Sequence, residues 1–344
     1  MSAEVFVHAV FRKTKVPSAL EKYWYYAGIV IMFLVGWHWP SVGLWMKSIN
    51  LSTYLIVLAF FLNGFALSSD SLLESMRQWR ILLTALLITF CISPALVYAV
   101  RLVIPGGDSL LAHGFQIVSL VPTLFVSAVV LTRVARGNAA VALNLTVSSN
   151  MLAIFITPII VRLTLGASSS HLNPTSMIGS MMLTVLLPTI AGQLARKRWE
   201  VWAERHAKLI TVASQCTILL FIVTGISALP RSVISPSVLT AAVIGCVALH
   251  AVLLLIGRFG GILIGIDEPE KRALTFCSAQ KSFVFNVLLC EHIFAGNSAS
   301  FGMAILPGIV YYLLVLTVDS VIAQWWNTHV VEEEEVCVDL LIDD

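Results

Sequence analysis

The sequence predicts an all-α polytopic membrane protein whose ten transmembrane helices form two inverted five-helix repeats. Three observations support this fold class. First, 58% of the 344 residues are hydrophobic and only 12% are charged, whereas a soluble domain carries about 25% charged residues. Second, short polar connections divide the chain into ten apolar stretches. Third, a segment of the chain recurs at an offset of 159 residues.

The apolar stretches are close to, or longer than, the length of about 20 residues that an α-helix needs to cross a bilayer. The first stretch has an aromatic rim and no small-residue cleavage site after it, so we expect it to be a retained span and not a signal peptide. The expected helices together form one membrane domain, residues 23–326. They cover residues 23–39, 51–68, 81–104, 113–132, 139–163, 176–195, 209–229, 238–264, 272–294 and 302–326.

Lysine and arginine are concentrated on one side of the expected bilayer. Of the 21 lysines and arginines, sixteen fall on the side of the N-terminus, four fall on the other side, and Lys281 lies inside a helix. Because cytoplasmic connections are rich in these residues, we expect both termini in the cytoplasm. The protein is then a multi-pass protein of the plasma membrane or of a secretory-pathway membrane.

The chain ends are expected to lie outside the membrane domain, and the cysteines and the missing motifs exclude several classes of function. Residues 1–22 are expected to form a cytoplasmic segment, and residues 327–344 an acidic tail that is either disordered or a motif for a protein partner. The six cysteines show no CxxC or Cys/His spacing, so we expect no metal site, disulfide framework or cofactor. No catalytic motif or basic-aromatic cluster occurs, which argues against an enzyme and against nucleic-acid binding. The expected partners are the bilayer and a small-molecule or ion substrate.

The repeat is centred on two Gly-Asn pairs. Aligning Gly137 with Gly296 places Asn138 on Asn297 and Pro122 on Lys281, at an offset of 159 residues. The repeats are then residues 23–163 and 176–326, with five helices each. Two units with an odd number of spans must have opposite orientations in one membrane. Inverted repeats are typical of secondary transporters, which bind solutes where broken helices cross at the midplane.

The two repeated segments, 113–132 and 272–294, carry the signals of broken helices. Pro122 lies inside the first apolar run, where it removes a backbone hydrogen bond. The second run contains Gln280, Lys281, Ser282 and Asn286. Backbone groups freed at membrane depth are tolerated only where they line a cavity or contact protein. We therefore expect Pro122 and Lys281 to approach each other near the centre.

Other polar residues of the apolar runs are open to two interpretations. Those of the span 139–163, which include Asn144 and Thr146, either face the crossing helices or form bonds between helices. Asn63 faces either a cleft or a neighbouring helix. Asp319 is expected to reach the membrane interface, His250 to be a packing residue, and the Glu291-His292 pair to be solvated at the outer surface.

The string LTRVARGNAAVALNLTVSSNMLAIFITPII, residues 131–160, resembles the bile acid:sodium symporter superfamily. FFLNGFALS, PTIAGQLAR and TFCSAQKSFVFN are closest to its sodium/bile acid cotransporter 7-like branch. The resemblance implies ten spans, with a panel domain of spans 1, 2, 6 and 7 and a core domain of the others. It also implies that helices 4 and 9 are broken and cross, and that substrate binds between panel and core.

The sequence departs from the sodium-driven members of that superfamily at their sodium ligands. An acidic residue and a glutamine of the ninth span are matched by Cys277 and Lys281, and an asparagine of the fourth by Val129. A serine and a threonine of the fifth span are matched by Ala142 and Thr146. Sodium prefers several oxygen ligands, so we expect the standard sodium sites to be largely lost.

Three roles remain open for Lys281. Its ammonium group replaces the missing sodium ion and holds the crossing together, or it releases a proton because desolvation disfavours the charged form. Alternatively, it snorkels or binds an anionic substrate. The candidate substrate- or ion-binding residues are Lys281, Cys277, Gln280, Ser282, Asn286, Pro122, Thr123, Ser127, Asn144, Thr146 and Asn63.

Two functions follow from the repeat, the broken spans and the resemblance. The first is secondary transport of a small solute by alternating access, together with the involvement in cellular calcium homeostasis that the resembled branch implies. The alternative is a membrane regulator that does not transport and that restrains calcium entry.

Overall fold

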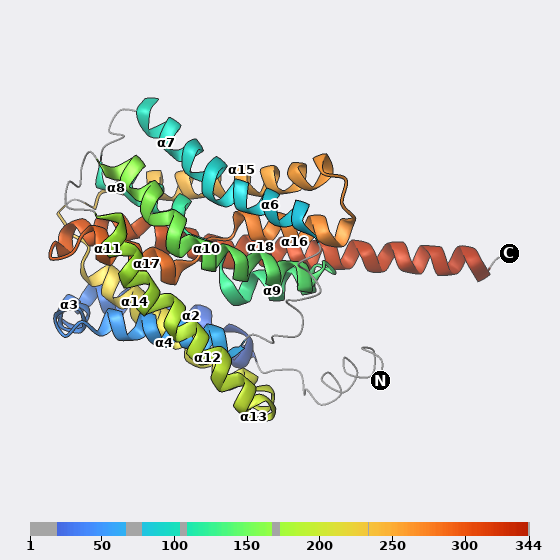
Figure 1. Cartoon of the computed structure of the whole chain (residues 1–344), viewed down its shortest axis with the longest axis horizontal. Coiled ribbons are helices and arrows are strands. Elements are labelled where there is room, and N and C mark those ends of the chain that lie inside the picture. Colours follow the sequence, from blue (N-terminus) through green and yellow to red (C-terminus); the bar gives the residue numbers. More distant parts are fainter. Residues whose placement is uncertain (1–18, 67–77, 104–108, 167–172, 233, 343–344) are drawn as a thin grey trace.

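All regular structure in the described part of the chain is helical (Figure 1). The computed structural model of the protein describes residues 19–66, 78–103, 109–166, 173–232 and 234–342. Residues 1–18 of the expected N-terminal segment lie outside this range. The elements are α2 (Ala19–His38), α3 (Pro40–Ser48), α4 (Leu51–Ala66), α6 (Trp79–Leu87), η1 (Ile88–Ile92), α7 (Ser93–Val103), α8 (Leu110–Leu120), α9 (Phe125–Val134), α10 (Ala139–Leu165), α11 (Pro174–Met181), η3 (Met182–Leu186), α12 (Leu187–Arg198), α13 (Glu200–Arg205), α14 (Ala207–Ser227), α15 (Pro236–Leu263), α16 (Glu268–Ala279), α17 (Phe283–Ile293) and α18 (Ser298–Ile342).

Seven helical segments within the described residues are long and apolar enough to cross a membrane. The number rises to nine if the bent pairs α2–α3 and α8–α9 each count as one span. The shorter α4 is also apolar and has 16 residues. The protein is therefore a multi-pass helical membrane protein, and the number of ten spans stays a prediction.

Prolines and polar caps explain several of the helix ends and irregularities. Pro40, Pro174 and Pro236 lie in the first turns of their helices, where a missing N–H group costs nothing. The π-helical turns η1 and η3 directly precede Ser93-Pro94 and Leu187-Pro188. Because proline cannot donate to the carbonyl one turn earlier, the backbone widens at these points and the two long helices continue.

The helices form two groups that lie side by side in Figure 1, with α2, α4, α12 and α14 below and α6, α7, α8 and α15 above. In the first group α4 packs along α12, and α2 packs along α14. In the second group α15 packs along α16, and α8 packs along α18. A Cβ atom on Gly64 would lie 2.2 Å from the carbonyl oxygen of Thr189, so this glycine permits the close contact of α4 with α12.

The distribution of polarity is the one expected in a bilayer. The most apolar of the seven spans, α15, is also the least buried, and its exposed side chains include Leu255, Ile262 and Leu263. In the least apolar span, residues 268–293, every residue from Ala273 to Cys290 is buried. Lipid therefore contacts the apolar helices, and the polar residues gather inside the protein.

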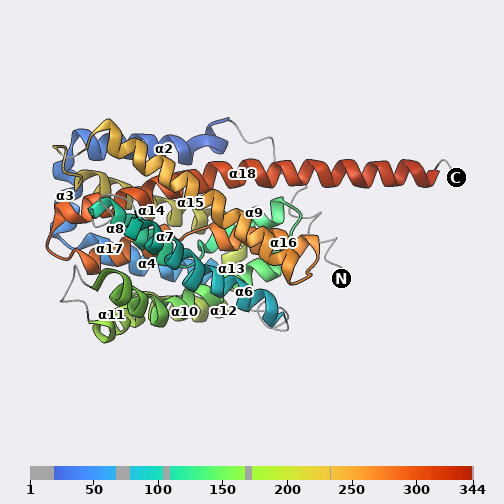
Figure 2. The same cartoon turned by 90° about the horizontal axis from the view of Figure 1, so that it is seen from above.

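The C-terminal helix extends well beyond the other helices (Figure 2). It begins at Ser298 and runs without a break for 45 residues to Ile342. The predicted end of the last span, residue 326, thus lies within a longer helix. The expectation of a disordered tail is wrong for the backbone up to Ile342, and a protein partner for this tail stays a prediction.

Candidate functional site

The first half of the candidate site is the break between α8 and α9. Residues 121–124 lie between the two helices, whose axes differ by 63°. Pro122 has no N–H group and Val121 is extended, so the helical hydrogen bonds stop at Leu120. The predicted break of the segment 113–132 is therefore present.

The second half is the break between α16 and α17, at residues 280–282. Gln280 and Ser282 both have extended backbones, and the hydroxyl group of Ser282 accepts a hydrogen bond from the Phe285 N–H at 3.4 Å. This serine therefore caps α17. The predicted break of the segment 272–294 is also present, and every residue of the break is buried.

Three hydrogen bonds join the two breaks, in addition to that of Lys281 described below. Ser282 N donates to Pro122 O at 2.8 Å, and the Thr123 hydroxyl donates to Cys277 O at 2.7 Å. The Ser127 hydroxyl donates to the side-chain oxygen of Gln280 at 2.8 Å. Some of the backbone groups that each break leaves free are thus satisfied by the other break, as membrane depth requires. We call this region, residues 119–127 and 277–282, the crossover.

Lys281 is 3% exposed and lies in the crossover. Its ammonium group donates to the carbonyl oxygen of Ser119 at 3.4 Å, and that same oxygen accepts a hydrogen bond from the Ser93 hydroxyl at 3.1 Å. Within the described residues no carboxylate forms an ion pair with Lys281. The lysine therefore contacts a backbone carbonyl freed at the end of α8.

The helix α10 contributes one polar face to the crossover. Asn150 donates from its side-chain nitrogen to Thr123 O at 2.9 Å and to Thr146 O at 2.8 Å. The Thr146 hydroxyl lies 4.0 Å from the sulfur of Cys277, which in turn lies 3.6 Å from Ala142 O. Asn144 is bonded to the hydroxyl of Ser148 at 3.2 Å on the same helix. Thr146 and Asn150 thus face the crossover.

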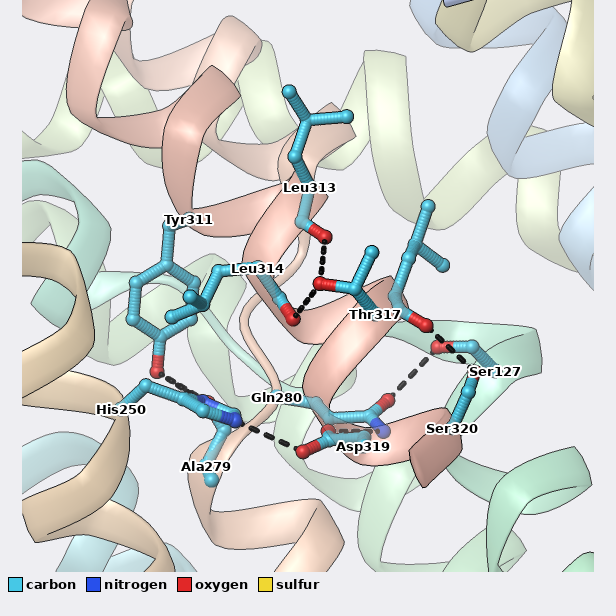
Figure 3. A network of polar contacts seen from close by, with 11 residues as sticks. Ser127, His250, Ala279, Gln280, Tyr311, Leu313, Leu314, Thr317, Asp319 and Ser320 are labelled. Atoms are coloured by element: carbon cyan, nitrogen blue, oxygen red, sulfur yellow. Dashed lines mark hydrogen bonds and ion pairs between the residues drawn. The ribbon is translucent and has the colours of Figure 1, made fainter. Parts of the chain in front are cut away.

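A second buried network extends from the crossover to α15 and α18 (Figure 3). Gln280 donates to one carboxylate oxygen of Asp319 at 2.8 Å, and the other oxygen lies 2.8 Å from Nε2 of His250. Nδ1 of His250 lies 3.2 Å from the hydroxyl of Tyr311, which donates to Ala279 O at 2.6 Å. We call Gln280, Asp319, His250 and Tyr311 the histidine–aspartate network.

This network corrects the expectation for Asp319 and extends the one for His250. Asp319 does not reach the interface, because it is 0% exposed and bonded to two side chains. His250 is buried, as expected of a packing residue, but it also contacts an acid from another helix. Ionisable residues inside apolar runs usually pair with each other. The presence of two ionisable residues inside apolar runs, His250 and Asp319, was therefore the sequence signal that could have predicted this contact.

A cavity of about 380 Å³ lies beside the crossover. Ser127 and Ser282 of the crossover line it, and so does Asn63 of α4, which answers the open question about that residue. On its wall the hydroxyl groups of Tyr25 and Tyr312 contact each other at 2.7 Å, which joins α2 to α18. The further lining residues include Phe125, Thr211, Ser214, Gln215 and Thr217.

Apart from Thr146, which faces the crossover, two of the expected site residues lie outside both the crossover and the cavity lining. Asn286 is buried on α17, where a Cβ atom on Gly308 would lie 2.2 Å from its side-chain oxygen. Gly308 therefore makes room for Asn286 where α17 meets α18. Asn144 is the other residue, since its bonded partner is Ser148 of the same helix.

The Glu291-His292 pair is less solvated than expected. Glu291 lies 3.8 Å from the ammonium group of Lys47, and their side chains are 23% and 15% exposed. Nε2 of His292 lies 2.7 Å from the hydroxyl of Ser180. These residues line a second cavity, of about 700 Å³, between α3, α11 and α17.

Comparisons with known proteins find a family and relatives that cover most of the chain. The model of the SBF-like CPA transporter family matches residues 23–328. The uncharacterized protein PA2026 of Pseudomonas aeruginosa is 29% identical over 285 residues, which cover 81% of this chain and 84% of that protein. Sodium/bile acid cotransporter 7 of Xenopus tropicalis is 27% identical over 318 residues, 88% of this chain and 91% of that protein. The protein of the same name from Mus musculus is 26% identical over 329 residues, 92% and 95% of the two chains.

These matches confirm the resemblance to the bile acid:sodium symporter superfamily. Because the family and the two cotransporters are named as transporters, the expectation that the chain is not an enzyme is also confirmed.

Proposed function

Because the chain belongs to the SBF-like CPA transporter family, we propose that it is a secondary transporter of a small solute by alternating access. The observation that carries this proposal is the crossover, where two broken helices meet beside a cavity. Solute sites of secondary transporters form where half-helices end near the midplane, because the freed backbone groups there can contact ligands.

The inverted repeat is part of the proposal, and the helix ends support it. The helices α8 and α16 end at Leu120 and Ala279, and α9 and α17 end at Val134 and Ile293, in both cases 159 residues apart. The first turns of the next helices are capped in the same way. Asn138 accepts from the N–H three residues later at 3.2 Å, and Asn297 accepts likewise at 3.0 Å.

We further propose that solute binds in the 380 Å³ cavity between a panel and a core. The panel comprises α2, α4, α11–α12 and α14, and the core comprises the remaining spans. The cavity is lined from both sides, by α2, α4 and α14 and by α9, α17 and α18. Its lining offers hydroxyl and amide groups without Asp, Glu, Lys, Arg or His among the described residues. This chemistry favours an uncharged polar or amphipathic solute, because a buried charge needs a partner.

Lys281 is proposed to be a built-in cation that replaces the sodium ions of the sodium-driven members. Its contact with Ser119 O supports this role, since the ammonium group bonds a carbonyl that a helix break has freed. Cys277 and Thr146 offer a sulfur atom and one hydroxyl where sodium needs several oxygens. The standard sodium sites are, on this proposal, largely lost.

The remaining expectations stay predictions. They are the cytoplasmic position of both termini, the plasma membrane or secretory pathway as location, and the involvement in calcium homeostasis. The alternative of a regulator that restrains calcium entry without transport stays a prediction as well, and the experiment that follows separates it from transport.

Labelling of a cysteine in the cavity from both sides of the membrane tests the proposed function. The Asn63→Cys variant is reacted with a membrane-impermeant maleimide in right-side-out and in inside-out vesicles. Alternating access predicts that Cys at this position is labelled from both sides, because the cavity opens to each side in turn. The matched control, Val201→Cys on the 79% exposed position of α13, is expected to react from one side only.

The parent chain without either substitution corrects for its own cysteines. If the Asn63→Cys variant reacts from a single side under all conditions, the transporter proposal fails and a regulator with one fixed conformation is favoured.

A further inference from the structure

We propose that His250 and Asp319 form a binding site for a single proton, and that this proton holds α15, α16 and α18 together during the transport cycle. The proposal rests on the proposed function for its role in transport, but the site itself follows from the hydrogen bonds alone. It concerns the side chains of the network drawn in Figure 3 and not the ammonium group of Lys281.

The number of protons follows from the direction of each bond. The hydroxyl of Tyr311 has one hydrogen, which it donates to Ala279 O at 2.6 Å. At its 3.2 Å contact with Nδ1 of His250, the hydroxyl oxygen must therefore accept. Nδ1 consequently carries a hydrogen. The free side of the imidazole is then Nε2, which faces Asp319.

The same reasoning applies from the side of Gln280. Its side-chain oxygen accepts from the hydroxyl of Ser127, so its nitrogen lies against Asp319 and donates to Oδ2. Oδ2 of Asp319 is therefore an acceptor. Only the 2.8 Å contact between Oδ1 and Nε2 of His250 remains, and a contact of that length needs one hydrogen between the two atoms.

One proton thus belongs to the pair as a whole. With the proton on Nε2 the pair is an imidazolium and a carboxylate, and with the proton on Oδ1 it is an imidazole and a carboxylic acid. Both forms have no net charge. Loss of the proton would place the lone pairs of Nε2 and Oδ1 against each other. It would also leave an unpaired negative charge between His250 and Asp319, which are 2% and 0% exposed. Such a charge is very unfavourable in this environment, so the closed contact requires the proton.

No other charged group of the described residues takes the place of this proton. Tyr311 of α18 contacts His250, and the next titratable group is Cys246 of α15, whose sulfur lies 3.4 Å from Pro307 O. The charged residues on the helices packed against α15 and α18 have other environments. Lys281 contacts Ser119 O, Arg258 and Lys271 contact Glu268, Arg272 contacts Ala135 O, Glu291 contacts Lys47, and Arg80, Arg133 and Lys208 are exposed. Of the histidines on these helices, His113 lies on α8, Nε2 of His292 on α17 contacts Ser180, and Nδ1 of His329 on α18 lies 2.9 Å from Trp325 O. Glu270 of α16 accepts a hydrogen bond from Gln78.

The site is connected to the cavity by a short chain of bonds. Ser127 lines the cavity and donates to Gln280, which donates to Asp319. Gln280 also lies directly before Lys281 in the α16–α17 break. A change in the proton occupancy of Asp319 would therefore alter the bond that holds Gln280, and with it the contact between the two breaks.

The pH dependence of thermal stability tests the site without any substrate. Above about pH 6.5 an unfolded histidine is neutral and an unfolded aspartate is ionised, so the unfolded pair holds one proton fewer than the folded pair. Folding then takes up a proton, and stability falls as the pH rises. The pair therefore contributes a fall in the Tm of the purified protein above that pH, which we expect to appear as the difference between the wild type and the Asp319→Asn variant.

The Asp319→Asn variant removes this contribution and keeps the hydrogen bonds. An asparagine at this position can donate to Nε2 of His250 and accept from Gln280 without a shared proton. We expect its Tm to fall less than that of the wild type above about pH 6.5. Ser320→Ala, on the next residue of α18, removes a hydroxyl that donates to Leu316 O, its partner within the described residues, and serves as the matched control with the wild-type slope.

Parallel Tm curves of the wild type and Asp319→Asn across this range would overturn the proton site. Should Asp319→Asn not fold, the double variant His250→Phe/Asp319→Leu replaces the pair by apolar groups and must show the same loss of slope. Labelling at Asn63→Cys then separates the two proposals. If labelling occurs from both sides but its pH dependence, measured relative to that of Val201→Cys, is the same with and without Asp319→Asn, the role of the proton fails while the transporter proposal stands. If labelling is one-sided, transport fails and the Tm curves still decide the proton site.

Discussion

Replacing Thr123 by valine tests whether the two helix breaks stabilise each other. The Thr123 hydroxyl is buried and donates to Cys277 O at 2.7 Å, in the last turn of α16, where carbonyl groups lack a helical donor. Valine keeps the shape of the side chain but leaves that carbonyl without its donor. The lost bond contributes about 0.5–1.5 kcal/mol, and an unsatisfied buried acceptor costs about 1–3 kcal/mol. We expect the free energy of unfolding to decrease by about 1–3 kcal/mol.

Thr132 supplies a matched control on the same segment. It is also buried, but its hydroxyl has no hydrogen-bond partner within the described residues. Thr132→Val therefore removes a polar group that is not satisfied, and the protein should be equally or more stable. Both variants are compared by reversible unfolding in detergent micelles. An equal effect of the two substitutions would refute the conclusion that the Thr123 hydroxyl joins the two breaks.

Three further predictions follow from contacts elsewhere in the structure. Gly64→Ala should destabilise the protein by about 1–3 kcal/mol, because the added Cβ atom would overlap α12. Its control is Gly179→Ala, which should leave the Tm unchanged because no atom lies within 4 Å of the added Cβ atom. Replacing potassium by sodium at constant ionic strength should not raise the Tm; a sodium-specific rise would contradict the role of Lys281 as the built-in cation. Tyr25→Phe should cost about 0.5–1.5 kcal/mol in unfolding measurements, because it removes the hydroxyl contact to Tyr312; an unchanged stability would show that this contact does not join α2 to α18.

The helix breaks could be predicted from the sequence because their causes are local. Pro122 cannot complete a helix in any context, and the polar residues around Lys281 are unusual in an apolar run. The 159-residue offset gave a further reason to expect both breaks at corresponding positions. The contact of Ser282 N with Pro122 O follows from this pairing, and it required no knowledge of distant side chains.

The histidine–aspartate network could not be predicted in the same way, because its parts come from three helices. His250 and Asp319 are 69 residues apart, and each residue alone has a common explanation, one as a packing residue and the other near a helix end. Their contact depends on how α15 packs against α18. The 88° bend after His38 was likewise missed, although Pro40 marks its position.

The arrangement of charges at the crossover links the two proposals. If Lys281 supplies a fixed positive charge in place of sodium ions, that charge does not enter or leave with the solute. A transporter needs some quantity that changes during the cycle to drive the solute in one direction. On the second proposal, the His250–Asp319 pair releases and regains its proton as the contact between the two side chains opens and closes. The fixed lysine and the exchangeable proton together therefore favour a proton, not sodium, as the coupling ion.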